Sequence, residues 1–300
     1  MTDSSEIRQS TNRIMVMEPL EFYANPQTMD TNSYQHEFDH DVADFHERAV
    51  ADFRAFRDLL VEHGVNMTTT LGRKGCPDDI FCNNWVSTHQ GGRMILYPML
   101  AENRRTERRK RLIADLLQKT YSDILDYSAY EQEGKFLEST GAMWLDRVNQ
   151  IAYQARSSRS NDELAMLWCK DNNYQHFPFE TEHKGKPVYH ADVVMWVGTE
   201  IAGINSECLK SRDIVDHLKQ KREVVEFTND QMMAFCGNSL EVIGTAGEHM
   251  LVMSHAGYES LRDDQKDMLS RFYKTIITPK IPTIEYYGGG SARCMLLELF

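Results

Sequence analysis

The stretch YYGGGSARCMLLELF, residues 286–300, brings together in one segment the features that decide the fold. Gly288-Gly289-Gly290 permits a tight turn with positive φ angles, and the cysteine that follows, Cys294, leads into an apolar, strand-like run. A thiol at the mouth of a glycine turn is accessible to a substrate, and Arg293 beside it is expected to lower its pKa. A buried structural cysteine is the alternative, because free cysteines are usually of that kind. This stretch alone leaves both interpretations open.

The composition is that of a globular protein of 300 residues, with 41% hydrophobic and 26% charged side chains. The net charge of −12 argues against nucleic acid or an anionic membrane as the main partner. No apolar run approaches the ~20 residues of a transmembrane helix, and the first six residues contain no apolar signal core. We therefore expect a cytoplasmic protein without nucleic-acid or membrane partners, and the sequence leaves a homo-oligomer open.

The six cysteines are dispersed along the chain and form no CxxC pair; they are residues 76, 82, 169, 208, 236 and 294. Free thiols in a reducing compartment fit this spacing better than a disulfide scaffold does. Residues 1–12 are polar and are expected to be a flexible N-terminus. The rest of the chain, residues 13–300, is expected to form one catalytic domain.

Apolar periodicity predicts an alternation of strands and helices. Strands are expected at residues 14–17, 65–71, 93–97, 150–153 and 201–204, and helices at residues 41–60, 162–169, 213–221 and 261–272. The first of these helices has apolar residues at steps of three and four, and Gly64 is expected to follow its C-terminus. This alternation indicates an α/β protein.

A short motif near the first predicted helix, His36-Glu37-Phe38-Asp39-His40, matches the HExxH pattern of zinc proteases. His46 falls where some of these enzymes have a third histidine, but the glycine that such a site requires is replaced by Ala43. Ten residues of continuous helix would also separate His36 from His46 by roughly 15 Å, too far to share one metal ion. We therefore expect a solvated helix start here and no metal site.

Basic residues are concentrated at residues 104–111, where Glu102, Glu107 and several apolar residues accompany them. The mixture favours the solvated face of a helix over a nucleic-acid-binding patch. One arginine near the start of this run remains a candidate for binding a substrate carboxylate.

A repeat of about 50 residues runs through the chain. Five polar segments are centred near residues 82, 138, 190, 236 and 294, and an apolar strand-like run follows each of them. A repeat of this length with several strands per unit predicts a propeller-like array whose polar segments converge on the axis. Coincidence is the alternative, since any α/β protein alternates strands and helices. Because the five segments supply carboxylates, a histidine and a thiol, we favour the repeat.

These segments resemble the penteins, the guanidine-modifying superfamily that includes arginine deiminases, dimethylarginine hydrolases, amidinotransferases and a citrulline-utilisation hydrolase group. Residues 288–295 resemble the deiminase nucleophile segment, and His190-Ala191-Asp192 resembles the family's His-x-Asp. Glu138-Ser139-Thr140-Gly141 stands where others have Glu-Gly-Gly-Asp. Residues 77–85 resemble the Pro-Asp-x-x-Phe-x-Asn-Asn-Trp segment of the citrulline group, and Gly237-Asn238 fits the fourth blade. The resemblance covers nearly the whole chain in the right order.

The resemblance implies a five-bladed α/β propeller with pseudo-fivefold repeats and an active site on its axis. Cys294 would attack the planar carbon of a guanidino or ureido group, and His190 would protonate the leaving amine and then activate water. Glu138 would orient His190. Asp78 and Asp192 would bind the N–H groups of the substrate, with Asp79 as the alternative to Asp78.

The same resemblance implies a small-molecule guanidino or ureido substrate and no metal or organic cofactor. By analogy with deiminases, Arg104 and Arg159 would hold a substrate carboxylate. The citrulline group usually has asparagine where this chain has Asp192, and often has proline where it has Cys82. An aspartate at position 192 favours a cationic guanidinium, because an unpaired buried carboxylate is costly. The Asn-Asn-Trp segment favours the citrulline group instead, so the choice between an arginine-like and a citrulline-like substrate stays open.

Three classes of function remain. The first is a cysteine-dependent hydrolase of a guanidino or ureido C–N bond, which passes through a covalent thiouronium-type intermediate. The second is an amidinotransferase, in which an amine acceptor replaces water. The third is a non-catalytic binding protein, since a translation initiation factor shares the pentein fold without its catalytic residues. The complete set of Cys294, His190 and Glu138 favours an enzyme.

Overall fold

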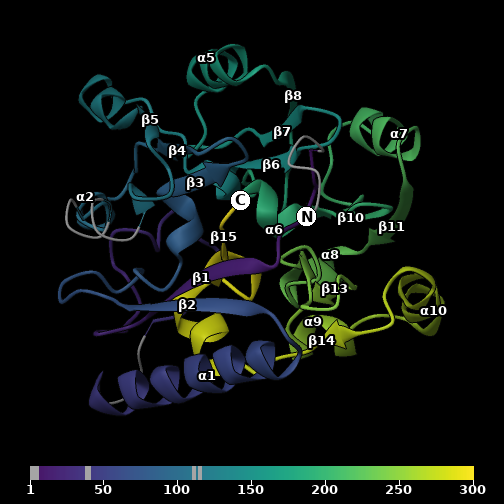
Figure 1. The fold of residues 1–300 in the computed structure, drawn as a ribbon, viewed down its shortest axis with the longest axis horizontal. Coiled ribbons are helices and arrows are strands. Elements are labelled where there is room, and N and C mark those ends of the chain that lie inside the picture. Colours follow the sequence, from purple (N-terminus) through teal and green to yellow (C-terminus); the bar gives the residue numbers. More distant parts are fainter. Residues whose placement is uncertain (1–6, 38–41, 110–112, 114–116) are drawn as a thin grey trace.

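The computed structural model describes residues 7–37, 42–109, 113 and 117–300. Its strands form five separate three-stranded sheets, which are arranged around a common centre (Figure 1). Helices α1 (Val42–Glu62), α5 (Asp162–Asn172), α7 (Asp213–Lys219) and α10 (Asp263–Phe272) lie at the periphery of this ring. The expected five-bladed α/β propeller with pseudo-fivefold repeats is confirmed.

Each sheet repeats one topology, an antiparallel pair of strands followed by a strand that lies parallel to the second. In order around the ring the sheets are β3 (Val86–His89), β4 (Arg93–Leu96) and β5 (Asp123–Asp126); β6 (Met143–Asp146), β7 (Ile151–Ala155) and β8 (Gln175–Phe179); β9 (Met195–Val197), β10 (Ile201–Asn205) and β11 (Glu223–Phe227); β12 (Leu240–Ile243), β13 (His249–Val252) and β14 (Ile276–Ile277); and β15 (Leu297–Glu298), β1 (Arg13–Glu18) and β2 (Asn66–Leu71). Because parallel neighbours need a crossover connection, a helical segment lies between the second and third strand of a sheet.

The crossover helices are amphipathic, as their sequence predicts. Helix α1 joins β1 to β2 and buries Phe45, Ala49, Phe53, Phe56 and Leu60, which are spaced by three and four residues. Gly64 follows it with a φ angle of +77°, the left-handed conformation expected after a helix C-terminus. The other crossovers are α2 (Glu102–Arg105), α5, α7, and the pair α9 (His255–Glu259) and α10, with η3 (Ser128–Glu133) and α8 (Asn229–Met233) in loops.

The fifth sheet joins the two ends of the sequence. Strand β15 pairs antiparallel with β1, so that Ile14 lies opposite Glu298 and Met15 lies opposite Leu297. The cysteine segment at residues 286–300 is thereby fixed against the first strand of the chain. This pairing closes the ring of sheets and places Cys294 next to residues from the other four repeats.

The five polar segments identified in the sequence lie directly before the first strand of each sheet. Four of them form short helical turns, η1 (Cys82–Asn84), α4 (Ser139–Ala142), α6 (Ala191–Val194) and η5 (Arg293–Met295), and the fourth repeat forms a turn that ends near Asn238. Turn α4 packs against both η1 and α6, and η1 packs against η5. The polar segments therefore converge at the centre of the ring, as the repeat predicts.

The first residues that the structure describes are hydrogen-bonded to strands of the second, third and fourth sheets. The side chain of Gln9 donates hydrogen bonds to the carbonyl oxygens of Leu145 and Val197, and Ser10 donates to Glu241. Gln9, Ser10 and Thr11 are buried. Residues 1–6 of the segment expected to be flexible lie outside the described residues. The domain boundary at residue 12 stays a prediction.

The region of the HExxH motif is described only in part. The ring of His36 stacks on that of Tyr286 at a centroid distance of 4.0 Å, whereas His40 lies outside the described residues. Within the described ranges, no three His, Cys, Asp or Glu side chains are grouped closely enough to hold a metal ion. None of the helices in that same part of the chain is long and apolar enough to span a bilayer.

The basic run at residues 104–111 was expected to form a solvated helix face, and the structure differs from this expectation at two of its arginines. Arg104 is only 2% exposed, and Arg108 is half-buried against Glu131 and the carbonyl oxygen of Tyr97. The expectation is wrong for these two residues because Glu107 and Glu131 pair with them and allow them to be buried. Residues 110 and 111 lie outside the described residues.

Candidate active site

A small cavity lies at the centre of the ring, where the polar segments meet. It is lined by Thr28, Asn32, Asp78, Phe81, Asn84, Arg104, Arg159, Tyr189, His190, Gly288, Gly289, Gly290 and Cys294. Five of the seven site residues expected from the sequence are in this lining. The other two, Glu138 and Asp192, are buried directly behind it and contact His190 and Cys294.

Cys294 is held in place by Asn238 of the fourth repeat. The side-chain oxygen of Asn238 accepts a hydrogen bond from the backbone N–H of Cys294 at 3.2 Å. Its amide nitrogen lies 3.0 Å from the cysteine sulfur and donates to it. The thiol in turn lies 3.4 Å from Oδ2 of Asp192. Asn238 thus fixes both the backbone and the sulfur of Cys294 in the cavity wall.

The thiol of Cys294 is buried, and its pKa is raised above the ordinary value. Burial is the main cause, and the negative charge of Asp192 adds to it. The expected effect of Arg293 is wrong, because its guanidinium points away from the sulfur. Arg293 donates to the carbonyl oxygen of Leu296 and to Glu298, and it stacks over Trp144. The side chain that precedes the cysteine therefore belongs to the packing under the site.

His190 and Glu138 form a buried pair. Nε2 of His190 lies 2.8 Å from Oε2 of Glu138, and the opposite ring nitrogen, Nδ1, faces Oδ1 of Asp192 at 3.8 Å. Burial opposes the ionisation of Glu138, but Arg159 and the hydrogen bond from His190 outweigh it and lower its pKa to about 2. A carboxylate at this position keeps the proton of a neutral imidazole on Nε2 and leaves Nδ1 free to accept another.

Asp78 and Asp192 each use only one carboxylate oxygen in hydrogen bonds with the described residues. Oδ2 of Asp78 accepts from Asn25 at 2.8 Å, and Oδ2 of Asp192 accepts from Asn83 at 3.1 Å. Oδ1 of both residues is buried and accepts no hydrogen bond from the described residues. Burial raises the pKa of both carboxyls, against the opposing charges of Arg104 near Asp78 and of His190 near Asp192. These two oxygens are available to N–H donors of a ligand.

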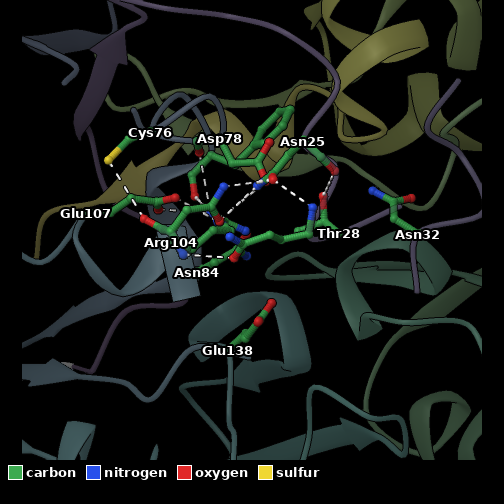
Figure 2. A network of polar contacts seen from close by, with 12 residues as sticks. Asn25, Thr28, Asn32, Cys76, Asp78, Asn84, Arg104, Glu107 and Glu138 are labelled. Carbon is green, nitrogen blue, oxygen red and sulfur yellow. Dashed lines mark hydrogen bonds and ion pairs between the residues drawn. The ribbon is translucent and has the colours of Figure 1, made fainter. Parts of the chain in front are cut away.

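The two arginines predicted to hold a substrate carboxylate border the cavity, but both already have protein partners. Arg104 contacts Glu107, Asn84 and two backbone carbonyl oxygens, as Figure 2 shows in part. Arg159 contacts Glu138 at 3.4 Å and Thr31 at 2.7 Å, and its guanidinium lies over the ring of Tyr189. Both arginines brace the walls of the cavity, and their role toward a substrate stays a proposal.

Two asparagines, Asn84 and Asn238, belong to the site although the sequence did not single them out as site residues. Asn84 lines the cavity, and its amide nitrogen has no partner among the described residues. Both lie within the segments that carry the family resemblance, which is the signal that pointed to them. Their side chains could not be assigned without the geometry, because an asparagine in a turn commonly serves the turn itself.

Of the two adjacent aspartates, Asp78 borders the cavity, and its role toward a substrate stays a prediction. Asp79 is fully buried but does not border the cavity. Its burial raises its pKa to about 6. Cys82 and Cys236 are packed thiols, as expected from the sequence, with hydrogen bonds to backbone carbonyl oxygens.

Comparisons with known structures show the same fold. The apo structure of ArgZ, an arginine dihydrolase from the ornithine-ammonia cycle in cyanobacteria, has a TM-score of 0.73 at 17% identity. The match covers 95% of this chain and 40% of the ArgZ chain, so this chain spans less than half of that protein. A cysteine-to-serine variant of the ArgZ N-terminal domain, bound to substrate, matches over 95% of this chain and 97% of its own, with 16% identity and a TM-score of 0.73.

A second enzyme gives a similar result. The dimethylarginine dimethylaminohydrolase adduct with 4-chloro-2-hydroxymethylpyridine has a TM-score of 0.63 at 18% identity, over 96% of this chain and 99% of that one. No curated protein matches the sequence. The family model described as N,N dimethylarginine dimethylhydrolase, eukaryotic, matches residues 18–300. The chain therefore belongs to this family, within the pentein superfamily of guanidino-modifying enzymes.

Proposed function

We propose that this protein is a cysteine-dependent hydrolase that cleaves a guanidino C–N bond of arginine or an N-methylated arginine. The observation that carries the proposal is a pair of buried carboxylate oxygens, Oδ1 of Asp78 and Oδ1 of Asp192, that accept no hydrogen bond from the described residues. Asp78 lines the same cavity as Cys294, and Asp192 contacts the thiol through its other oxygen. A planar guanidinium cation offers the N–H donors and the positive charge that these oxygens lack. A neutral ureido group would bring no positive charge to either carboxylate.

The proposed reaction has two steps. Nδ1 of His190 takes the proton of the Cys294 thiol as the sulfur forms a bond to the guanidino carbon, and His190 passes that proton to the leaving amine as its C–N bond breaks. Water then attacks the amidino carbon, His190 takes a proton from it, and the S–C bond breaks to release the ureido product. Glu138 holds His190 in the required tautomer throughout.

The raised pKa of Cys294 fits a nucleophile that is activated by its substrate. In the free site the thiol lies against Asp192 and stays protonated. A guanidinium bound at Asp192 neutralises that carboxylate and favours the thiolate. Ionisation of the nucleophile is thereby coupled to the arrival of a cation.

Two observations on relatives support this proposal. A variant of the ArgZ N-terminal domain is described as covalently bound to a reaction intermediate, and another as bound to substrate after a cysteine was replaced. The family to which the chain belongs is named for hydrolysis of N,N-dimethylarginine.

All six cysteines of this chain are free and buried, which fits a reducing compartment such as the cytoplasm.

The proposal is tested by incubating the protein separately with arginine, N,N-dimethylarginine and citrulline, with Cys294→Ala as the control. Ammonia, dimethylamine, citrulline and ornithine are then quantified. We expect amine release from at least one of the two guanidino compounds, and none with Cys294→Ala. Dimethylamine would identify the methylated substrate, and ornithine from arginine would indicate a second hydrolysis. Turnover of citrulline alone, or turnover that survives Cys294→Ala, would contradict the proposal.

A further inference from the structure

Glu107 is a fully buried carboxylate outside the lining of the cavity. It follows α2 and binds one partner with both of its oxygens. Oε1 accepts from Nε of Arg104 at 2.8 Å, and Oε2 accepts from Nη2 of the same guanidinium at 3.1 Å. This two-point contact fixes the plane and the direction of the guanidinium (Figure 2).

Arg104 transmits this orientation to the cavity wall. Its Nη1 donates to the side-chain oxygen of Asn84 at 2.9 Å, and its Nη2 donates to the carbonyl oxygen of Phe81 at 3.1 Å. With its oxygen held by Arg104, Asn84 places its amide nitrogen close to Gly141, where it has no hydrogen-bond partner among the described residues. The orientation of an amide in the cavity lining therefore depends on the Arg104 guanidinium.

The same guanidinium lies near a carboxylate that the proposed substrate needs. Nε of Arg104 is 3.8 Å from Oδ2 of Asp78, which is farther than its 2.8 Å contact to Glu107. Arg104 and Asp78 are both almost fully buried, so a closer approach would form a strong pair. If Glu107 did not hold Arg104, the cation would turn to Asp78 and neutralise it.

We propose that Glu107 is a positioning residue, which holds Arg104 against Asn84 and keeps the Asp78 carboxylate free for the cationic end of the substrate. This inference rests on the proposed guanidino hydrolase function. It assigns Glu107 an effect on substrate binding through Arg104, without contact to the substrate.

The test compares Glu107→Gln with Glu107→Asp and with a matched control, Asp146→Asn. Asp146 is also fully buried and pairs with an arginine, Arg222, at 2.6 Å, but it does not border the cavity. We expect kcat/KM of Glu107→Gln to fall about 10²-fold, mainly through a higher KM, since a small displacement of binding groups has effects of this size. Glu107→Asp keeps the charge but is one methylene shorter, so its KM should rise by a smaller factor, about three- to tenfold, and its kcat/KM should stay above about a tenth of the wild-type value. Asp146→Asn should stay within about twofold of wild type, because its pair is remote from the site.

A second measurement separates this inference from the proposed function and does not depend on turnover. The affinity for arginine and for N,N-dimethylarginine is measured by calorimetry in the Cys294→Ala background, with and without Glu107→Gln. We expect the added substitution to weaken binding about 10-fold or more, and we expect Arg104→Gln to restore part of the loss by removing the cation that competes for Asp78.

Each outcome decides one of the two claims. Absence of binding and of turnover in proteins that retain Glu107 would overturn the proposed function. Turnover by wild type with unchanged KM and affinity in Glu107→Gln would overturn the positioning role alone. Should Glu107→Gln fail to fold, as judged by circular dichroism, Glu107→Asp decides: an unchanged KM together with unchanged affinity for both ligands overturns the inference, and a raised KM supports it.

Discussion

The sulfur of Cys294 lies 3.4 Å from Oδ2 of Asp192, and both groups are buried. A carboxylate this close to a thiol disfavours the thiolate, which is the reactive form of a cysteine nucleophile. The relationship is therefore unfavourable for thiolate formation in the free protein. Under the proposed function it becomes favourable when a cationic substrate occupies the site, which would link the reactivity of Cys294 to substrate charge.

Replacing Asp192 with asparagine should separate its effect on the thiol pKa from its effect on substrate binding. Asp192→Asn removes the negative charge that raises the pKa of the thiol, so alkylation of Cys294 by iodoacetamide at neutral pH should become several-fold faster. Hydrolysis should fall about 10²–10³-fold, because a buried partner of the guanidinium is lost. The labelling rate is followed by mass spectrometry of the Cys294 peptide, with Asp146→Asn as the control. A slower labelling rate in Asp192→Asn would contradict the assigned cause of the raised pKa.

Replacing Glu138 with glutamine should lower kcat more than it changes KM. Glu138→Gln leaves the volume nearly unchanged but replaces the carboxylate that accepts a hydrogen bond from His190 with an amide. We expect kcat to fall about 10²–10⁴-fold, as for the loss of an acid–base residue, with a smaller change in KM. Steady-state kinetics measure kcat and KM separately. Because the pKa of Glu138 is lowered to about 2, it stays ionised above pH 4, and an acidic limb of the pH–rate profile above that pH must come from another group.

Gly141 is required for the close approach of Asn84 and His190. A Cβ at this position would lie 2.4 Å from the amide nitrogen of Asn84 and 2.9 Å from the His190 ring. Gly141→Ala should therefore displace both side chains and lower kcat/KM about 10²-fold. Gly185→Ala is the control, since a Cβ there meets nothing within 4 Å and costs only backbone strain at φ +77°. Equal activity losses in the two variants, measured alongside thermal melts, would show that the effect is general destabilisation.

Glu241 should make stability depend on pH in the acid range. Burial opposes its ionisation, but its hydrogen bonds from His249, Ser10 and Thr199 lower its pKa from 4.5 to about 2. Its contribution to the free energy of unfolding is complete above pH 4.5 and is lost as the pH falls toward 2. The shift corresponds to about 3 kcal/mol.

Urea unfolding of Glu241→Gln tests this dependence. The variant should be less stable than wild type by about this amount, 3 kcal/mol, at pH 7, and the difference should shrink below pH 4.5. The exposed neighbour Glu248 provides the control, as Glu248→Gln should leave stability within about 0.5 kcal/mol of wild type. A difference between Glu241→Gln and wild type that stays constant down to pH 3 would contradict the assignment.

The repeat and the strand-and-helix alternation predicted a propeller-like array, and the family resemblance supplied the five-bladed α/β propeller. Spacings of three and four apolar residues predicted α1, and the polar segments before β3, β6, β9, β12 and β15 predicted convergence on the axis. The burial of Arg104 could not be predicted in this way. It depends on Glu107 and Asp78, and a charge pattern along the sequence does not reveal which charges are paired in the interior.

The sequence predicted which residues border the cavity more accurately than it predicted how those residues interact. Cys294, His190 and Asp78 were expected at one cavity and are found there. The prediction that Arg293 lowers the pKa of the Cys294 thiol was wrong. Neighbours in sequence point in different directions when the backbone turns between them. The roles of the site residues and the choice between guanidino and citrulline substrates stay predictions.

The most direct test of the central claim is to look for the covalent intermediate on Cys294. Wild type and Cys294→Ala are mixed with arginine or N,N-dimethylarginine, quenched in acid within milliseconds to seconds, and examined by intact-protein and peptide mass spectrometry. The account predicts that wild type gains the mass of one amidino group on the Cys294 peptide during turnover, and that Cys294→Ala gains none. Turnover with no adduct at any quench time, or an adduct on another residue, would contradict the account.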